Sequence, residues 1–149
     1  SERAAAAELF WGELGKVLDA EYALDPVARI DRSLDVMRQV QQQARPVPLT
    51  EVQSDIWLLD DPALRFGPLR FGTFVEAGIE SLGALAPLLR PNEQTLTLFG
   101  SPPETVFAAL KAARVAVDRI VPVGRALDIG LFWDGRDMVS LLSRRVEVG

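Results

Sequence analysis

Residues 94–123 read QTLTLFGSPPETVFAALKAARVAVDRIVPV. Thr95–Phe99 and Val115–Val121 are short apolar runs rich in β-branched residues, a pattern typical of strands. Residues 102–113 between them have helical spacing, and Ser101–Glu104 supplies a Ser N-cap, a Pro in the first turn and a Glu three residues after the cap. A strand, a helix and a strand in this order predict two parallel strands joined by a right-handed crossover.

The flanking sequence continues the alternation of strands and helices. Strands are predicted at Val52–Leu59 and Phe71–Val75, and helices at Ile79–Leu89 and from about Gly135 to Val146. Turn signals separate them, at Asp60-Asp61-Pro62 and Gly67-Pro68. We therefore expect an α/β fold, an open parallel or mixed sheet flanked by helices.

Two helices are predicted before the first strand. The first covers Ser1 to about Ala20, where apolar residues recur at helical intervals around four consecutive alanines. The second begins at Asp25-Pro26, a capping signal, and ends near Ala44 before a Pro-rich run. One apolar stripe on the second helix is expected to face the core: Val27, Ile30, Leu34, Met37 and Val40. The opposite face is expected in solvent: Arg29, Asp31, Arg32, Asp35, Arg38 and three glutamines.

Length and composition limit the classes of protein. The 149 residues fit one domain or the C-terminal part of a catalytic domain, with a helical segment at 1–44 and β-α-β units at 45–149. There is no Cys and no His, which excludes disulfides, thiolate and imidazole metal sites, and Ser-His or Cys-His catalysis within this chain. No metal site is predicted.

Charge and hydropathy patterning exclude two kinds of partner. The net charge is −5, and the largest cluster of basic residues is Arg144-Arg145, whereas nucleic-acid binding needs several basic groups on one face. The longest apolar runs are far shorter than the ~20 residues that span a bilayer. We expect a soluble cytoplasmic protein with no membrane span and no nucleic-acid partner.

The C-terminal third resembles one enzyme family. Val117–Asp128, VDRIVPVGRALD, is followed by FWDGRD at Phe132–Asp137 and LLSR at Leu141–Arg144. This order and spacing resemble the end of LuxC-type acyl-CoA reductases, which read roughly v-x-R-I-V-P-x-G-x-A-L-D, then W-D-G-x-D, then a short helix ending in L-S-R. Gln94–Gly100 resembles the family's L-Q-T strand, so the match runs from about Gln94 to Val146.

The resemblance implies a fold like that of aldehyde dehydrogenases and a two-step reduction. A cysteine takes the acyl group from a fatty acyl-CoA as a thioester, and NADPH delivers hydride to release a fatty aldehyde. In the family the cysteine lies shortly before an alanine-rich helix, so we expect it upstream of Ser1. The chain would then hold no catalytic residue, and alone it would bind NADP poorly. Self-association to a homo-oligomer is also implied.

Two segments of the resembling block are candidate cofactor- or substrate-binding residues. Gly124 and Arg125 follow a predicted strand, where α/β sheets place ligands, and Arg125 with Arg119 or Arg114 is suited to a phosphate of coenzyme A or of the cofactor. The alternative is a solvated strand edge. Trp133-Asp134-Gly135 offers backbone N–H groups at a helix start, near the acyl or cofactor site. Here the alternative is that Asp134 caps the last helix and Trp133 packs.

Three weaker candidates lie outside that block. A set of carboxylates offers an acid/base or cation site, although turns favour acidic residues for conformational reasons: Glu51, Asp55, Asp60, Asp61 and Glu76. Phe66-Gly67-Pro68 resembles an aldehyde dehydrogenase turn that holds the nicotinamide ribose, but the acidic residue expected before it is Leu64. Phe10, Trp11 and Tyr22 are suited either to an acyl-chain wall or to an ordinary core or subunit contact.

Two other functions remain open from the sequence. The absence of Cys and His suits a non-catalytic binding or assembly module that kept the fold and lost the chemistry. A relative of aldehyde dehydrogenases that acts on a small semialdehyde is the other alternative.

Overall fold

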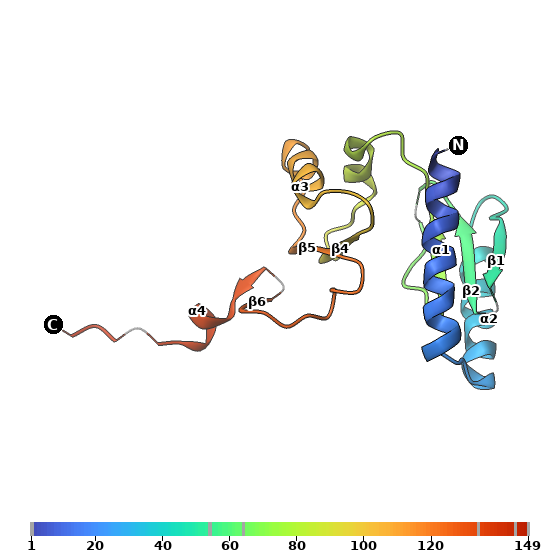
Figure 1. Cartoon of the computed structure of the whole chain (residues 1–149), viewed down its shortest axis with the longest axis horizontal. Coiled ribbons are helices and arrows are strands. Elements are labelled where there is room, and N and C mark those ends of the chain that lie inside the picture. Colours follow the sequence, from blue (N-terminus) through green and yellow to red (C-terminus); the bar gives the residue numbers. More distant parts are fainter. Residues whose placement is uncertain (1, 54, 64, 134, 145, 149) are drawn as a thin grey trace. The chain divides into compact units, whose positions relative to one another are not determined.

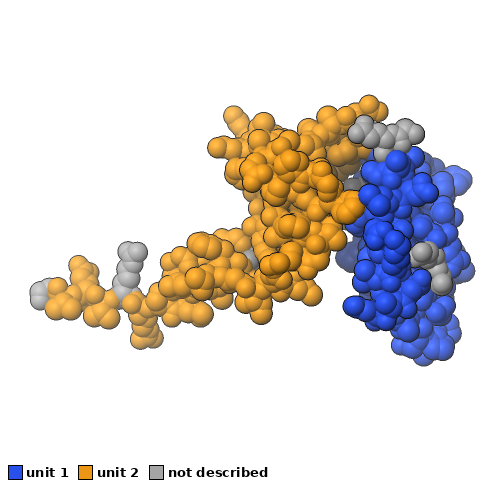
Figure 2. Space-filling model, viewed as in Figure 1, with its two compact units in different colours: residues 1–78 blue, residues 79–149 orange. Residues whose placement is uncertain are grey.

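The computed structural model describes residues 2–53, 55–63, 65–133, 135–144 and 146–148. The chain divides into two compact units, residues 1–78 (unit 1) and 79–149 (unit 2), coloured separately in Figure 2. Both units mix helices with strands, as predicted. Among the described residues, the strands form three small sheets of three, two and two strands. The predicted single open sheet is therefore replaced by local sheets.

Unit 1 contains two helices and a three-stranded sheet (Figure 1). Its elements are α1 (Glu2–Glu21), α2 (Pro26–Gln41), β1 (Leu49–Gln53), β2 (Ile56–Asp60) and β3 (Thr73–Glu76). The strand order is β1-β2-β3, with β1 antiparallel and β3 parallel to the central β2. The helical segment at 1–44 thus belongs to the same unit as the first three strands.

The two helices cover opposite faces of this sheet, because successive side chains of a strand point to opposite sides. A core cluster lies between the sheet and α2: Val36, Leu59 and Phe66 are buried, with Val40, Val47, Trp57, Leu69 and Val75 packed against them. On the other face, Trp11 of α1 lies 5.1 Å from the ring of Phe74 and donates a hydrogen bond to Glu76. Unit 1 is a three-layer α/β/α arrangement.

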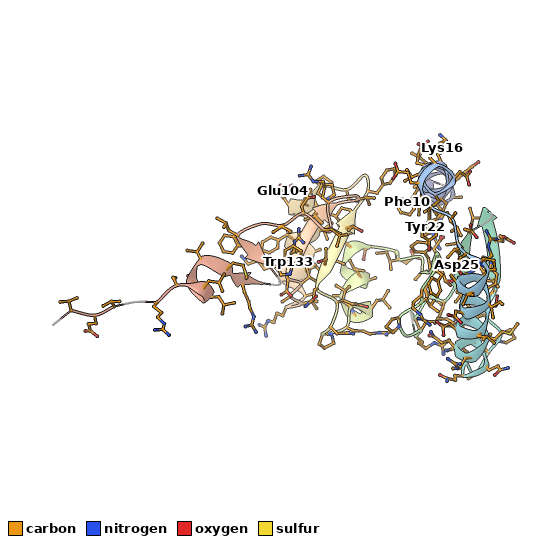
Figure 3. The ribbon with its side chains drawn as sticks, turned by 90° about the horizontal axis from the view of Figure 1, so that it is seen from below. Phe10, Lys16, Tyr22, Asp25, Glu104 and Trp133 are labelled. Atoms are coloured by element: carbon orange, nitrogen blue, oxygen red, sulfur yellow. The ribbon has the colours of Figure 1, made fainter. Side chains whose placement is uncertain are left out.

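The start of α2 confirms the predicted cap, but its orientation is the reverse of the prediction. The Asp25 carboxylate accepts a hydrogen bond from the backbone N–H of Ala28 (2.9 Å), at the position visible in Figure 3. The side of α2 that meets the sheet holds Ala28, Arg32 and Val36, all buried. Most of the predicted core stripe is exposed instead: Val27, Ile30, Leu34 and Met37.

Arg32 explains this orientation. Its guanidinium lies 4.2 Å from the centre of the Trp57 ring, within cation–π distance, and donates hydrogen bonds to the backbone carbonyls of Asp55 (3.1 Å) and Phe71 (3.4 Å). The Asp55 carboxylate lies 3.8 Å away and also binds Arg29 (3.1 Å). The expectation that Arg32 is solvated was wrong, because stacking and carbonyl hydrogen bonds replace its water.

The predicted strand at Val52–Leu59 is two strands. Gln53 pairs with Ile56, so β1 and β2 form a tight hairpin within the stretch that the apolar pattern reads as continuous. The strand predicted from Phe71 begins only at Thr73, because Phe71 and Gly72 have positive φ angles of 57° and 74° and form a turn. The break between β1 and β2 and the start of β3 are set by strand pairing and by the turn, and the local apolar pattern carries no information on either.

Unit 2 begins with the predicted β-α-β unit. Strands β4 (Thr95–Leu98) and β5 (Arg119–Pro122) are parallel and are joined by α3 (Pro103–Ala112), as expected. Pro102 is the N-cap of α3 and no side chain caps it, so the predicted capping role of Ser101 was wrong. The helix predicted at Ile79–Leu89 is a 3-10 helix, η1 (Leu82–Leu88), with Pro87 inside it.

The C-terminal segment is less helical than predicted. A short hairpin, β6 (Phe132–Trp133) and β7 (Arg136–Asp137), precedes α4 (Met138–Leu142), which replaces the helix expected from Gly135 to Val146. Asp137 caps α4, since its carboxylate accepts hydrogen bonds from the backbone N–H groups of Val139 (3.0 Å) and Ser140 (3.3 Å). Bonds from the Ser140 hydroxyl and these N–H groups lower the pKa of Asp137. Asp137 is therefore the N-cap of α4, and Asp134, for which the sequence also offered a capping role, lies outside the described residues.

Candidate functional site

The first candidate segment follows the carboxyl end of β5. Val123 donates a backbone hydrogen bond to Leu98 (3.0 Å), so β4 and β5 stay paired up to this point. Gly124 comes next with a φ of +86°, a left-handed conformation that favours glycine, and Arg125 follows. Parallel strands place their carboxyl ends at one edge, and open α/β sheets bind ligands there. Gly124 and Arg125 therefore occupy the edge at which the sequence predicted a ligand.

Arg119 organises the loop after Gly124. Its guanidinium donates hydrogen bonds to the backbone carbonyls of Ala126 (2.7 Å), Asp128 (3.0 Å) and Arg125 (3.5 Å). Because the guanidinium is a rigid fork of donors, these contacts fix several carbonyls at once and fold residues 125–128 back toward β5. The loop conformation thus depends on a side chain that precedes it by six to nine residues.

The three arginines considered for a phosphate have different surroundings. Arg125 is exposed and its side chain forms an ion pair with Asp128. Arg119 directs its donors to the loop carbonyls, as above. Arg114 lies just after α3 with a φ of 57°, toward the opposite end of β5. The structure therefore brings Arg119 and Arg125 together and leaves Arg114 apart, and phosphate binding at Arg125 stays a prediction.

The second candidate segment converges on the same place. The Arg119 guanidinium lies 5.1 Å from the centre of the Trp133 ring. Gly135 has a φ of 71°, and a Cβ atom there would lie 2.6 Å from a carboxylate oxygen of Asp118. Asp134 lies outside the described residues, so its predicted role is not addressed. The two segments meet at Asp118 and Arg119, which we name the Arg119 junction: Asp118, Arg119, Gly124–Asp128, Trp133 and Gly135.

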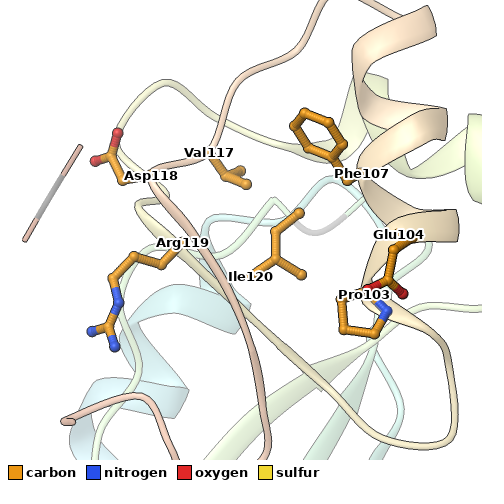
Figure 4. A pocket seen from close by; sticks show the side chains of 7 residues that line it. All are labelled: Pro103, Glu104, Phe107, Val117, Asp118, Arg119 and Ile120. Carbon is orange, nitrogen blue, oxygen red and sulfur yellow. The ribbon is translucent and has the colours of Figure 1, made fainter. Parts of the chain in front are cut away.

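A shallow hollow of about 350 Å3 adjoins this junction, between α3 and β5 (Figure 4). Its apolar wall is formed by Phe107, Val117 and Ile120, and its charged lining residues are Glu104, Asp118 and Arg119. The apolar wall favours an apolar group. The sequence did not single out this hollow, since Phe107 and Ile120 lie on different elements and share no local pattern.

The predicted carboxylate site is occupied by structural interactions. Asp61 is fully buried and binds Arg45 (2.9 Å) and Arg65 (3.3 Å). Its carboxylate also accepts backbone hydrogen bonds from Ala63 (3.3 Å) and Arg65 (2.9 Å). Burial raises the pKa of Asp61, but these hydrogen bonds outweigh burial and lower the pKa to about 2.

Two of the other carboxylates of that set, Asp60 and Glu76, are cross-strand neighbours in the β2–β3 pair, whereas Asp55 lies just before β2. Asp55 binds Arg29 and Arg32, whereas Glu76 accepts a hydrogen bond from Trp11 (3.0 Å) and lies 3.8 Å from Arg3. Within the ranges that the structure describes, no group of three or more His, Cys, Asp or Glu residues is placed to hold a metal ion. Asp55, Asp61 and Glu76 thus stabilise turns and helix packing in unit 1.

The turn that resembles a ribose-binding turn is part of the core of unit 1. Phe66 is buried in the cluster with Val36 and Leu59. The Gln39 side chain accepts a hydrogen bond from the N–H of Gly67 (2.8 Å) and donates one to the carbonyl of Pro68 (3.3 Å). The side-chain amide of Gln39 therefore makes the two hydrogen bonds that the backbone of a neighbouring strand would make. Leu64, where the resemblance breaks, lies outside the described residues.

The aromatic residues of α1 form an ordinary packing contact. The rings of Phe10 and Trp11 lie 4.8 Å apart in an edge-to-face arrangement, and Trp11 also contacts Phe74. Tyr22, just after α1, is 39% exposed. Packing against the sheet accounts for Trp11, and a role as an acyl-chain wall stays a prediction.

Comparisons of the chain with protein-family models, with curated proteins and with solved structures gave no match. Among the helices of the described residues, none combines the length and the apolar character needed to cross a membrane.

Proposed function

We propose that this chain is the C-terminal portion of an NADP-dependent acyl-CoA reductase that converts a fatty acyl-CoA to a fatty aldehyde. The cysteine that carries the acyl group as a thioester lies upstream of Ser1 in this proposal, and NADPH supplies the hydride. A cytoplasmic location belongs to the same proposal. The chain itself contributes a structural edge of the site and no catalytic residue.

The Arg119 junction is the observation that carries this proposal. The two most specific parts of the resembling block are RIVPVGRALD and FWDGRD, which are separated in sequence by Ile129–Leu131. Arg119 touches both, through the carbonyls of Ala126 and Asp128 and through the ring of Trp133. The two segments therefore form one cluster, in which the guanidinium of Arg119, the left-handed turn at Gly124 and the ring of Trp133 explain why these residue types occur. This supports reading the block as one functional element of a larger catalytic domain.

The location of Gly124 and Arg125 also supports the proposal. They follow the carboxyl end of β5, which is paired in parallel with β4, whereas Asp118 and Arg119 lie at the start of that strand. Arg125 is exposed just after the Gly124 turn, where an anionic group from solvent would compete with Asp128 for its guanidinium. The adjoining hollow of Phe107, Val117 and Ile120 offers an apolar contact for an acyl chain or a pantetheine arm.

The experiment uses the protein from its own reading frame, including whatever is encoded upstream of Ser1. We expect it to oxidise NADPH in the presence of a fatty acyl-CoA and to release the aldehyde. Without NADPH, intact-mass measurement should show the mass of one acyl group on a cysteine. Replacing that cysteine with Ala should abolish both signals. An upstream sequence without cysteine, or an intact protein without NADPH oxidation, would overturn the proposal.

The other two functions are outcomes of the same experiment. If the intact protein forms no acyl adduct with acyl-CoA and does not oxidise NADPH, the result favours a non-catalytic assembly module. The absence of Cys and His in this chain is the observation that supports that alternative. Activity on small semialdehydes without any acyl adduct from acyl-CoA favours the aldehyde dehydrogenase relative.

A further inference from the structure

Helix α2 carries a second apolar face that unit 1 leaves uncovered. Four side chains lie on it, with exposed fractions of 67% for Val27, 61% for Ile30, 51% for Leu34 and 61% for Met37. The face directed to the sheet is already filled by Ala28, Arg32 and Val36. We name these four residues the outer stripe of α2.

The spacing of the outer stripe is that of a helix-pairing seam. Val27, Ile30, Leu34 and Met37 are separated by three, four and three residues, the alternation that keeps apolar side chains in line along one side of a helix. Helices buried on both faces usually read as apolar throughout, but this one has polar flanks. The stripe is therefore narrow, straight and suited to one further helix.

Charges beside the stripe identify what that helix is. Asp31 and Arg38 lie seven residues apart on the same flank, one negative toward the start of α2 and one positive toward its end. A two-fold axis at Leu34 sets that residue against its own copy. It brings Asp31 of one helix within one residue, about 1.5 Å along the axis, of Arg38 of the other, twice, and it brings Ile30 equally close to Met37. Of the two ways to pair α2 with its own copy, the antiparallel one matches the apolar seam and the charges together.

We propose that α2 pairs antiparallel with α2 of a second copy of this chain, around a two-fold axis at Leu34. The pairing buries the outer stripe of both helices and forms two Asp31–Arg38 ion pairs across the seam. It does not depend on the proposed acyl-CoA reduction, because no residue of unit 2 takes part.

The expected dimer is weak and dissociates on dilution. A helix of 16 residues is about 24 Å long, so one helix pair buries less than the ~800 Å2 per partner of a standard interface. Dimers should therefore be detected at protein concentrations of tens of micromolar and should be absent well below one micromolar. Sedimentation velocity or light scattering over this range measures it.

Cysteine cross-linking tests the axis directly, because the chain contains no cysteine. Leu34→Cys places the thiol next to its own copy, within the Cα separation of about 5.5 Å that a disulfide needs. Val27→Cys is the matched control on the same stripe; in the antiparallel pair its two copies lie about 21 Å apart along the axis. We expect Leu34→Cys to give a covalent dimer under mild oxidation at least tenfold faster than Val27→Cys. Equal rates, a faster Val27→Cys, or monomer at every concentration would overturn the pairing.

Charge reversal tests the flanks without altering the stripe. Asp31→Arg and Arg38→Asp each place like charges opposite each other and should raise the dimer dissociation constant roughly five- to tenfold. The double variant restores opposite charges and should return the dissociation constant to within about twofold of that of the original chain. Arg38 also lies 3.5 Å from Asp35 on its own helix, so circular dichroism must show unchanged helix content. If the double variant has a dimer dissociation constant as high as those of the single variants, the antiparallel register is contradicted.

Discussion

Unit 1 encloses its core between layers, whereas unit 2 has a smaller core and a C-terminal segment that contacts β5 through one arginine, Arg119. Among the described residues, seven buried apolar side chains belong to unit 1 and three to unit 2. In unit 2 the C-terminal segment leaves large apolar side chains in solvent, for example Leu127 at 85% and Ile129 at 90% exposed. Burial of apolar area is the main stabilising contribution in folding, so we expect unit 1 to be the more stable part.

The difference shows two ways in which charged residues contribute to a fold. In unit 1, Arg32 and Asp61 are buried, and their contacts hold the sheet, the helix and the turn together. In unit 2, Arg119 is near the surface and stabilises loop carbonyls instead of a core. Replacing a buried charge leaves its partners poorly solvated, whereas water can replace an exposed one. Substitutions of buried residues in unit 1 should therefore lower the free energy of unfolding more than substitutions in unit 2.

The largest effect is expected from the core of unit 1. Leu59 is fully buried, and Leu59→Ala should reduce the free energy of unfolding by about 2–5 kcal/mol because of lost burial and the cavity left behind. Leu127→Ala, at an exposed position, is the matched control and should change it by less than about 0.5 kcal/mol. Hydrogen exchange measured by mass spectrometry should show faster exchange in peptides of residues 1–78 only. Equal loss of protection in residues 79–149 would show that the two units unfold together.

A pH-dependent effect of about 2 kcal/mol is expected from Asp61. Its pKa is about 2 in the folded chain against an ordinary value of 3.8, so the stabilisation is fully present above about pH 4 and is lost as the pH falls toward 2. Asp61→Asn should destabilise unit 1 at pH 7 and flatten this part of the pH profile, as measured by urea unfolding at several pH values. The control is Asp60→Asn at the exposed neighbouring position. If Asp61→Asn keeps the original acid dependence, the buried carboxylate is not its source.

A smaller effect is expected from the Arg119 junction. Arg119→Ala removes the hydrogen bonds to the carbonyls of Ala126 and Asp128 and should cost about 1–2 kcal/mol in unit 2, with faster proteolysis in residues 123–135. Arg119→Lys should recover little of it, since an ammonium group lacks the fork. Arg125→Ala removes only an exposed ion pair and should leave proteolysis unchanged. Equal effects of Arg119→Ala and Arg125→Ala would contradict the assigned role of Arg119.

The smallest effect is expected at Gly124. A side chain there has open space around it, so Gly124→Ala is opposed only by the φ of +86° and should cost about 1 kcal/mol. Gly130→Ala is the control, because its Cβ would make only ordinary contacts with the backbone of Phe132 at 3.8 Å or more. Thermal unfolding of unit 2 measures both. A neutral Gly124→Ala would show that the turn is not held in the left-handed conformation.

Local sequence signals predicted the elements that rest on local interactions. The cap at Asp25, the first two helices and the parallel β4-α3-β5 unit were confirmed. Caps depend on residues a few positions apart, and a strand–helix–strand order leaves few topologies. The candidate segments at Gly124 and Trp133 were each visible in the sequence, but their meeting at Arg119 was not, because cation–π and carbonyl contacts have no local spacing rule.

What the sequence determined by itself is which residues share a face, and what the tertiary structure decided is which face meets the sheet. Periodicity correctly grouped Val27, Ile30, Leu34 and Met37, whereas Val40, predicted on the same stripe, packs against the core cluster, and α2 turns Arg32 and Val36 inward. Trp57 and the carbonyls of Asp55 and Phe71 come from other strands and turns, and they make burial of Arg32 favourable. The free energy of a buried side chain depends on its partners, and only the assembled fold brings those partners together.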